Sequence, residues 1–575
     1  MPTNGAIWRV VFMPNLTKSL SGFFTYKEQQ NKEHGFELLE NEDKKGLNNT
    51  DSIPNSGKQD VIDDADNANQ PDEVISTDLN INIQNIKQKF SLPKNQDIVI
   101  RNLKIGRKLS ACLVFVEGMI DKQLINISLL PRLMSEDILC DMKKKENAVD
   151  FLMENVIAVH DICKKTKYSD IIKQVLNGVT ALLVEGCNEC ILIETRGYEK
   201  RAVESPKTET VIKGSQEAFT ENLRTNVTMV RRIVKNEHLV TEMLSVGKTN
   251  GANCAVLYLE GVANPEIVSE LMKRINAVDA DFILSEGMLE QFIEDDSFMM
   301  LPQVLSTERP DRTASFLING QVVMITDGTP FAMAVPVNFF QLFHTSEETN
   351  VRWMYGAFLR AIRLFGFFCA MFLPGLYCAV VLFHPEMIPT ELLSSITRAR
   401  ESVPFPTVLE ILIMEFSFEL IREAGIRVAS IIGQTLGIVG ALILGQTAVA
   451  AGLVSPLLVI VVAITALGSF SIPNYSLAIA TRIIRFIFIL TGSAFGFYGV
   501  SLVLFLLVCV ACGMKSFGVP YLAPVAPKIN SDGGIALKKP IWISKNRPDE
   551  MNTNNTKKQG NNQSAWVNSP NQKEQ

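Results

Sequence analysis

The distribution of apolar residues divides the chain into a polar beginning, a mixed middle and an apolar last third. In the middle part, from about Leu92 to Phe343, short apolar runs alternate with helical patterns. The runs are short enough for buried strands, and they lie at 111–116, 190–193, 254–258, 315–318 and 322–325. Helical periodicity lies between them, at 148–163, 221–234 and 266–278. The mixture predicts an α/β domain of two subdomains, 91–220 and 221–345, with a long loop at 200–214 near their join.

The last third contains long runs without a charged residue. Residues 364–383 have the length of one bilayer crossing, and residues 486–514 form another such run. The run at 428–481 is long enough for two crossings and is interrupted near Gly452 and Pro456 and again near Pro473. We therefore predict an α-helical polytopic transmembrane domain at 355–515, with four to six membrane segments.

Basic residues on either side of the apolar runs predict the orientation. Three arginines precede the first run and four lysines follow the last, which places both termini in the cytoplasm. These residues are Arg352, Arg360, Arg363, Lys515, Lys528, Lys538 and Lys539. Arg482 and Arg485 conflict with a count of four crossings, because that count puts them on the outer side. Additional partial crossings between the first two long runs would remove the conflict.

Charge separates the ends of the chain from the rest. The net charge is −6, but residues 27–78 alone carry about −9, so the remainder is about +3. A polar, aromatic-poor composition predicts disorder for residues 1–90 and 551–575, on either side of the folded parts and a cytoplasmic C-terminal segment at 516–550. The mean hydropathy of +0.15 is an average that describes none of these parts.

The sequence carries no convincing catalytic or metal-binding motif. Gly247-Lys248-Thr249 resembles the end of a phosphate-binding loop, but Glu242 stands where that motif needs a glycine. Cys187 and Cys190 lack a second cysteine pair at zinc-ligand spacing. No secretory signal opens the chain. We expect a cytoplasmic N-terminal half that is no enzyme, without a metal, a cofactor or a nucleic-acid partner.

An acidic helix in the membrane third is the strongest candidate for function. Pro404 and Pro406 end the preceding segment, and Thr407 with Glu410 forms a capping-box pattern that opens the helix. At about 100° per residue, three later glutamates share one face, whereas Glu410 points elsewhere and is assigned to capping. The three are Glu415, Glu419 and Glu423.

Two interpretations of this acidic face stay open. The helix could lie flat at the membrane surface with its glutamates in water. Alternatively the glutamates face a water-filled path, because carboxylates at membrane depth are costly unless they line a cavity, bind cations or pair with a base such as Arg422 or Arg427. In an oligomer each glutamate position becomes a ring, an arrangement that selects cations. A chain with about four spans is a poor pore by itself, so this interpretation requires a homo-oligomeric ring.

Two polar motifs in the second subdomain predict turns. Glu308, Arg309 and Asp311 indicate a turn with a charge-paired arginine, and Asp327-Gly328 indicates a hairpin turn. This interpretation is favoured over a ligand site. We also hypothesise that these motifs couple the subdomain to the membrane.

Motifs spread over residues 101–548 carry a resemblance to a known family. They are Phe219-Thr220-Glu221-Asn222, Thr307-Glu308-Arg309-Pro310-Asp311, Asp327-Gly328-Thr329-Pro330, Leu373-Pro374-Gly375-Leu376-Tyr377, His384-Pro385-Glu386-Met387-Ile388-Pro389, Glu419-Leu420-Ile421-Arg422-Glu423-Ala424-Gly425 and Ile472-Pro473-Asn474-Tyr475-Ser476. In combination they resemble the A subunit of the GerA-type spore germinant receptors. One departure is Glu348-Thr349-Asn350-Val351-Arg352, where that family tends to show an acidic residue and two tyrosines before the arginine.

The resemblance implies a protein of the inner membrane of dormant spores. It implies a permease-like B subunit and a lipoprotein C subunit as partners, a two-part cytoplasmic N-terminal domain, and oligomerisation into a nutrient-gated channel that releases cations. Three alternatives stay open: a stage V sporulation AF-type paralogue that amplifies ion release, a secondary transporter with broken helices, and a non-conducting membrane scaffold.

Overall fold

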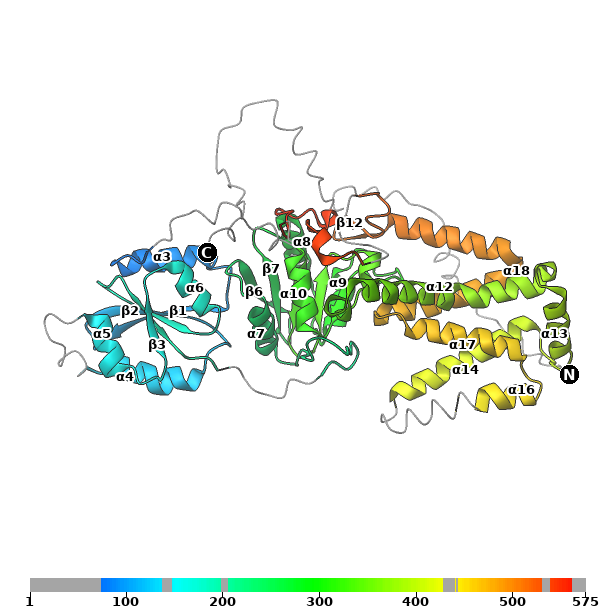
Figure 1. Ribbon diagram of the computed structural model, residues 1–575, viewed down its shortest axis with the longest axis horizontal. Coiled ribbons are helices and arrows are strands. Elements are labelled where there is room, and N and C mark those ends of the chain that lie inside the picture. Colours follow the sequence, from blue (N-terminus) through cyan, green and yellow to red (C-terminus); the bar gives the residue numbers. More distant parts are fainter. Residues whose placement is uncertain are drawn as a thin grey trace, which may run out of the picture. The chain divides into compact units, whose positions relative to one another are not determined.

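The α/β part of the chain contains two five-stranded antiparallel sheets, and long helices follow them in the sequence (Figure 1). The computed structural model describes residues 74–136, 147–197, 205–427, 440, 443–529 and 538–560. This arrangement confirms the predicted fold class, an α/β part in two subdomains followed by an α-helical part.

The first sheet has the strand order β1-β2-β4-β5-β3. Its strands are β1 (Ile98–Ile105), β2 (Leu109–Val116), β3 (Ile162–Lys165), β4 (Thr180–Val184) and β5 (Cys190–Ile193). The side chains of β2 and β4 point alternately to the two faces of the sheet. They are apolar and buried on both faces, because helices cover both. Helices α3 (Leu79–Lys89) and α6 (Tyr168–Val175) cover one face, and α4 (Leu130–Met134) and α5 (Ala148–Phe151) cover the other.

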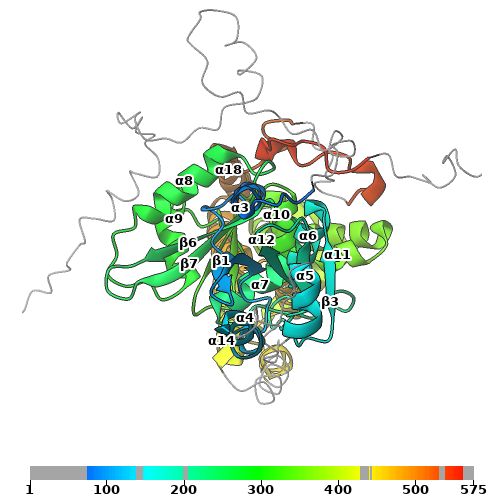
Figure 2. The same cartoon turned by 90° about the vertical axis from the view of Figure 1, so that its left-hand side faces the viewer.

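The second sheet repeats this topology in the order β6-β7-β9-β10-β8. Its strands are β6 (Leu239–Val246), β7 (Ala252–Leu259), β8 (Leu305–Thr307), β9 (Val322–Thr326) and β10 (Ala332–Val335). Helices α7 (Leu223–Ile233) and α10 (Pro310–Ile318) cover one face, and α8 (Pro265–Asn276) and α9 (Glu286–Ile293) cover the other (Figure 2). Helices and strands therefore follow one another in the same order in both subdomains, which is the pattern of a tandem duplication.

Several sequence predictions need correction. Residues 315–318, predicted as a strand, form the end of α10, because Pro310 at its first position starts a helix and a short apolar run suits either structure. The predicted helix at 148–163 ends at Val156 and is followed by the edge strand β3. The segment 79–89, predicted to be disordered, is helix α3, whose buried Leu79 and Ile86 pack on the first sheet.

The boundary between the subdomains and the end of the C-terminal segment also differ from prediction. Residues 205–220 were assigned to the first subdomain, but Phe219 lies in the core of the second and Thr208 donates to Glu308. Residues 551–560, predicted to be disordered, lie against the second subdomain, where Asn554 donates its backbone N–H to Val262 O at 3.2 Å.

A buried ion pair connects the two subdomains. Arg231 of α7, which is fully buried, donates from Nε and Nη2 to the Asp97 carboxylate at 2.9 and 2.8 Å, and from Nη2 to Asn95 Oδ1 at 3.3 Å. The Gln96 backbone N–H also donates to Thr241 O in β6 at 2.9 Å. Because a lone buried guanidinium is very costly, this pair fixes the loop before β1 against the second subdomain.

Two helices among the described residues are long and apolar enough to cross a membrane. They are α12 (Trp353–Phe383) and α18 (Tyr475–Gly513), the latter made of two helical parts joined at Gly496. Between them in the sequence lie α13 (Thr390–Glu401), α14 (Thr407–Arg427) and the apolar α17 (Pro456–Phe470). The first part of the run at 428–481, which was predicted to contain two crossings, lies outside the described residues at 428–439 and 441–442. The predicted break near Ser471–Asn474 separates α17 from α18.

Glycines let these helices approach closely. A Cβ atom at Gly375 of α12 would lie 2.7 Å from Phe488 O of α18, and one at Gly492 would lie 2.6 Å from Gly375 O. Gly468 of α17 meets Gly366 of α12 in the same way, at 2.5 Å from its carbonyl oxygen. Small residues at helix contacts are the usual means of association where lipid removes the hydrophobic driving force.

The first of these helices is joined to the second subdomain by a continuous apolar core. Phe367 of α12 packs edge-on against Phe339 and Phe343, with ring centroids 5.7 and 5.4 Å apart. After α18, the chain returns to the same subdomain, where Ser516 Oγ donates to Gln303 O at 2.7 Å and Phe517 lies under Arg274. Both ends of the helical part are thus anchored on one subdomain.

A half-buried carboxyl on α9, that of Glu290, predicts a stability that depends on pH. Burial, and then the neighbouring carboxylates Glu294 and Glu286, raise the pKa of Glu290 to about 8. Because the pKa of Glu290 is raised in the folded state, the contribution of this residue to the free energy of unfolding is complete below about pH 4.5. That contribution is lost as the pH rises through about 8. We expect Glu290→Gln to raise the free energy of unfolding by about 1 kcal/mol or more at pH 9 and to change it little at pH 5. Thermal unfolding of the purified protein at both pH values measures this, and an equal effect at both would contradict it.

Candidate functional site

Helix α14 carries the predicted acidic face from a buried end to an exposed one. Glu410, Ile411, Met414 and Glu415 are buried, and they face α17 and α18. The opposite face of α14 is apolar and exposed. It carries Leu409, Ile413, Phe416 and Leu420, whose spacing of three and four residues places them on one side of the helix. The helix thus buries carboxylates and exposes apolar side chains, the reverse of a helix on a soluble protein.

The innermost glutamate forms an ion pair with α18. Glu415 Oε2 lies 3.1 Å from Arg485 Nη2, and the two side chains are only 2% and 4% exposed. The Glu415 Oε1 and Arg485 Nε atoms have no hydrogen-bond partner among the described residues. The pair therefore neutralises both charges but leaves an acceptor and a donor available beside them.

The next two glutamates also form ion pairs, and they lie progressively closer to the exposed end of α14. Glu419 Oε1 accepts from Arg482 Nη1 at 3.0 Å and also pairs with Arg422. Glu423 pairs with Arg427 at 2.7 Å, and both of these side chains are well exposed. We call the three pairs Glu415–Arg485, Glu419–Arg482 and Glu423–Arg427 the ion-pair ladder.

Glu410 has a different role from the capping that the sequence predicted. The first backbone hydrogen bonds of α14 run to Pro406 O, so Thr407 lies inside the helix and no capping box forms. The Glu410 carboxylate is fully buried and accepts from the backbone N–H of Ser455, at the start of α17. Pro404 and Pro406 lie in the turn between α13 and α14, as their chemistry predicts.

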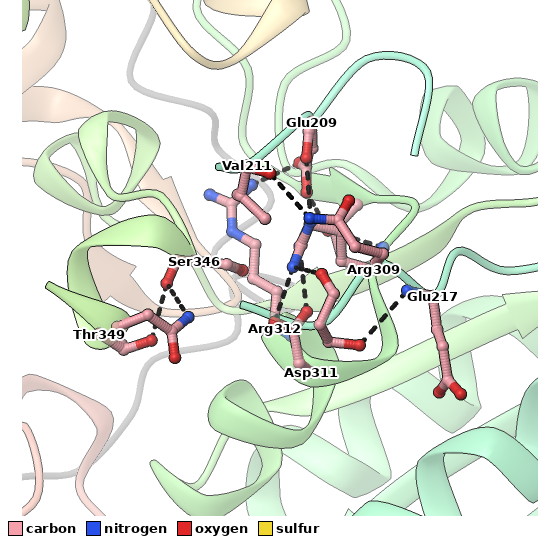
Figure 3. A network of polar contacts seen from close by, with 12 residues as sticks. Glu209, Val211, Glu217, Arg309, Asp311, Arg312, Ser346 and Thr349 are labelled. Carbon is pink, nitrogen blue, oxygen red and sulfur yellow. Dashed lines mark hydrogen bonds and ion pairs between the residues drawn. The ribbon is translucent and has the colours of Figure 1, made fainter. Parts of the chain in front are cut away.

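The predicted motif around Arg309 forms a buried network on the second subdomain (Figure 3). Arg309, 1% exposed, pairs with Asp311 through Nη2 at 2.9 Å and through Nε at 3.1 Å. Its other donor bonds run to the backbone oxygens of Glu209 and Ser215, at 3.1 and 2.7 Å. Arg309 thereby fixes the loop after residue 205 to the start of α10.

The neighbouring Glu308 and Arg312 extend the network in two directions. Glu308 Oε1 accepts from the backbone N–H of Thr208 and Glu209. Arg312 donates to Glu209 Oε1 at 2.5 Å and to His344 O at 2.9 Å, and His344 lies in the linker that leads to α12. The network therefore contacts the connection between the subdomain and the first long helix.

Asp327 and Gly328 form the turn between β9 and β10. Gly328 has φ +88°, a conformation that glycine adopts without strain. Asp327 Oδ1 accepts from the backbone N–H of Leu223 at 3.0 Å and so caps the start of α7. Asp327 and Gly328 therefore have structural roles within the second subdomain.

Sequence reasoning missed the residues that complete these sites. Arg482 and Arg485 were treated as an anomaly of orientation, although their spacing of three places them on one face of α18 opposite α14. Glu348 was noted only as a departure from the family pattern. It is 2% exposed and pairs with both Arg360 and Arg363 on the first turns of α12. The sequence signal that could have revealed this pairing is the presence of two arginines, three residues apart, at the start of an apolar helix.

These features define a membrane-associated protein with a duplicated α/β head, long apolar helices and paired charges inside the helical part. The chain belongs to the GerA family: residues 84–550 match the family described as Bacillus/Clostridium GerA spore germination protein. It is 35% identical to spore germination protein KA of Bacillus subtilis (strain 168), over 85% of this chain and 90% of the relative. It is 36% identical to spore germination protein GerLA of Bacillus cereus, over 82% of this chain and 95% of the relative.

A solved structure is similar to part of the chain. It is the crystal structure of the N-terminal domain of the A subunit of the Bacillus megaterium spore germinant receptor GerK3. The sequences are 31% identical, the match covers 47% of this chain and 99% of the crystallised one, and the TM-score is 0.38.

Proposed function

We propose that this protein is the A-type subunit of a germinant receptor and takes part in spore germination. Its membership of the GerA family and the names of its relatives support this role. The partners would be a permease-like B subunit and a lipoprotein C subunit. We further propose that the chain is a multi-pass protein of the inner spore membrane with both termini in the cytoplasm, in agreement with the basic residues at both ends of the helical part.

We propose that several copies form a ring whose opening releases cations, with the ion-pair ladder beside the conduction path. The observation that carries this proposal is the set of glutamates that α14 holds among apolar helices, from buried Glu415 to exposed Glu423. Carboxylates in such surroundings are retained at a cost, and they mark ion pathways in membrane proteins. The exposed apolar face of α14, at Ile413 and Phe416, is available for lipid or for another copy.

In one copy, the arginines neutralise the glutamates, so the ladder describes a closed state of the proposed path. Opening would require the α14 carboxylates to exchange arginine nitrogens for cations and water. The unpartnered Glu415 Oε1 is the atom at which such an exchange can begin, because it can accept a new ligand before the pair with Arg485 breaks.

Neutralising the ladder tests the path. We expect Glu415→Gln, Glu419→Gln and Glu423→Gln together to reduce cation release after germinant addition by at least tenfold, because the path loses the charges that attract cations. A second variant also carries Arg482→Gln and Arg485→Gln, which removes the two buried arginines that lose their partners and keeps hydrogen bonding. Cation release is measured in spores with matched amounts of each variant in the membrane.

Glu410→Gln is the matched control, because Glu410 is a buried glutamate of the same helix outside the ladder. Unchanged cation release in both neutralised variants would remove the ladder from the path. Neighbouring genes for a permease-like protein and a lipoprotein would support the receptor over a paralogue that acts later in germination.

A further inference from the structure

A polar cavity of about 360 Å³ lies where the second subdomain meets α12. Its walls come from the loop at Ser215, from α10, from the linker at 344–350 with the following turns of α12, and from the C-terminal segment at Lys538. Its lining includes Arg312, Gln321, Ser346, Glu348, Arg360 and Lys538. A ligand in this cavity would contact the head and the first long helix at once.

Three buried polar atoms in the cavity wall, on Gln321, Thr345 and Ser346, lack a hydrogen-bond partner among the described residues. Ser346, 8% exposed, has a hydroxyl without a hydrogen-bond partner among the described residues, and the same is true of Oε1 of Gln321, which is fully buried. Buried polar groups without partners are rare and costly. A ligand that accepts from Ser346 and donates to Gln321 would satisfy both.

The charges around the cavity are unbalanced. The cations that line it are Arg312, Arg360 and Lys538, and the carboxylates that line it are Asp311 and Glu348. Each of these carboxylates is paired with an arginine, and Lys538 forms no ion pair with either of them. Its ammonium donates to the neutral backbone oxygen of Glu348, and burial lowers the pKa of Lys538. A half-buried ammonium beside a neutral carbonyl is stabilised by an added anion.

We propose that this cavity binds a phosphate group, held by the Lys538 ammonium and the Ser346 hydroxyl. Ammonium and hydroxyl donors around an excess of positive charge are the chemistry that recognises phosphate oxygens. The bound group connects the C-terminal segment to the linker and so stiffens the junction between head and α12. The proposal stands independently of the proposed channel.

The phosphate group has two possible sources. One is a free phosphate or a small phosphorylated molecule from the cytoplasm. The other is the headgroup of an anionic lipid, because α12 begins with Trp353 and exposed Tyr355, side chains typical of a membrane interface. The experiment has one arm for each source.

In the first arm, inorganic phosphate is titrated into the full-length protein in a phosphate-free maltoside detergent, with chloride keeping the ionic strength constant. The midpoint of thermal unfolding reports binding, because a ligand of the folded state raises it. In the second arm, the protein is placed in phosphatidylcholine nanodiscs with and without phosphatidylglycerol. Both arms compare the wild type with Lys538→Gln, Ser346→Ala and the matched control Lys539→Gln, whose side chain is exposed next to Lys538.

We expect Lys538→Gln to weaken phosphate binding by about tenfold or more, Ser346→Ala to weaken it less, and Lys539→Gln to leave it unchanged. Stabilisation by inorganic phosphate identifies a free ligand, and stabilisation by phosphatidylglycerol alone identifies a lipid headgroup, provided that either requires Lys538. If Lys538→Gln and Lys539→Gln respond alike in both arms, the proposal is wrong.

Discussion

Replacing Glu415 by alanine is expected to destabilise the helical part by about 3 kcal/mol, which is enough to reduce the amount of assembled protein severely. The substitution leaves the Arg485 guanidinium, 4% exposed, without its carboxylate. A charged arginine at membrane depth costs about 2.5–3.5 kcal/mol when it must be accommodated in an apolar helix bundle. Thermal unfolding in detergent and the quantity of protein in isolated membranes measure the effect.

Arg427→Ala is the control for this prediction, because it removes the partner of Glu423 at the exposed end of the same ladder. We expect a change below about 1 kcal/mol there, since exposed ion pairs contribute little. Replacing Glu415 and Arg485 together by glutamine should recover most of the lost stability, because a neutral pair needs no counter-charge. If Glu415→Ala and Arg427→Ala have equal effects, the buried pair does not stabilise the helices.

Local patterns were sufficient to predict part of the head, namely strands β2, β5, β7 and β9 and helices α7 and α8. Apolar runs of suitable length, as in 190–193 and 322–325, became strands, and amphipathic periodicity located α7 and α8. The run at 315–318 failed because its apolar side chains pack as the face of α10, and only the contact with the second sheet decides between helix and strand. The duplication was not visible, because the two halves share topology rather than a recognisable repeat of residues.

For the candidate site, the sequence predicted the glutamates of α14 but not the arginines of α18 that pair with them. The glutamates of α14 were visible as an acidic face in an apolar segment, whereas their partners on α18 lie more than sixty residues away. Periodicity relates residues within a helix and says nothing about which helix lies opposite. Arg482 and Arg485 therefore conflicted with the predicted orientation until the packing of α14 and α18 gave them partners.

Charge reversal at Arg309 is expected to cause the second large loss of stability. The sequence predicts a turn with a charge-paired arginine that couples the subdomain to the membrane, and Arg309→Glu would test that coupling. The side chain is in fact 1% exposed and donates to Asp311 and to the backbone oxygens of Glu209 and Ser215. A glutamate there would bury a second negative charge beside Asp311 and leave both oxygens unpaired. We expect a loss of about 3–5 kcal/mol, so the second subdomain unfolds before signalling can be examined.

Unfolding of the full-length protein, followed by limited proteolysis of the 205–220 segment, measures this loss. Arg224→Glu is the control, because Arg224 is an exposed arginine of the same subdomain that pairs with Glu117 at the surface, where a change below about 1 kcal/mol is expected. If Arg309→Glu instead assembles in normal amounts and fails only to respond to germinant, the network transmits a signal without stabilising the fold. In that case Arg312, whose guanidinium reaches His344 O in the linker, becomes the next position to substitute, because it is the member of the network in direct contact with the path to α12.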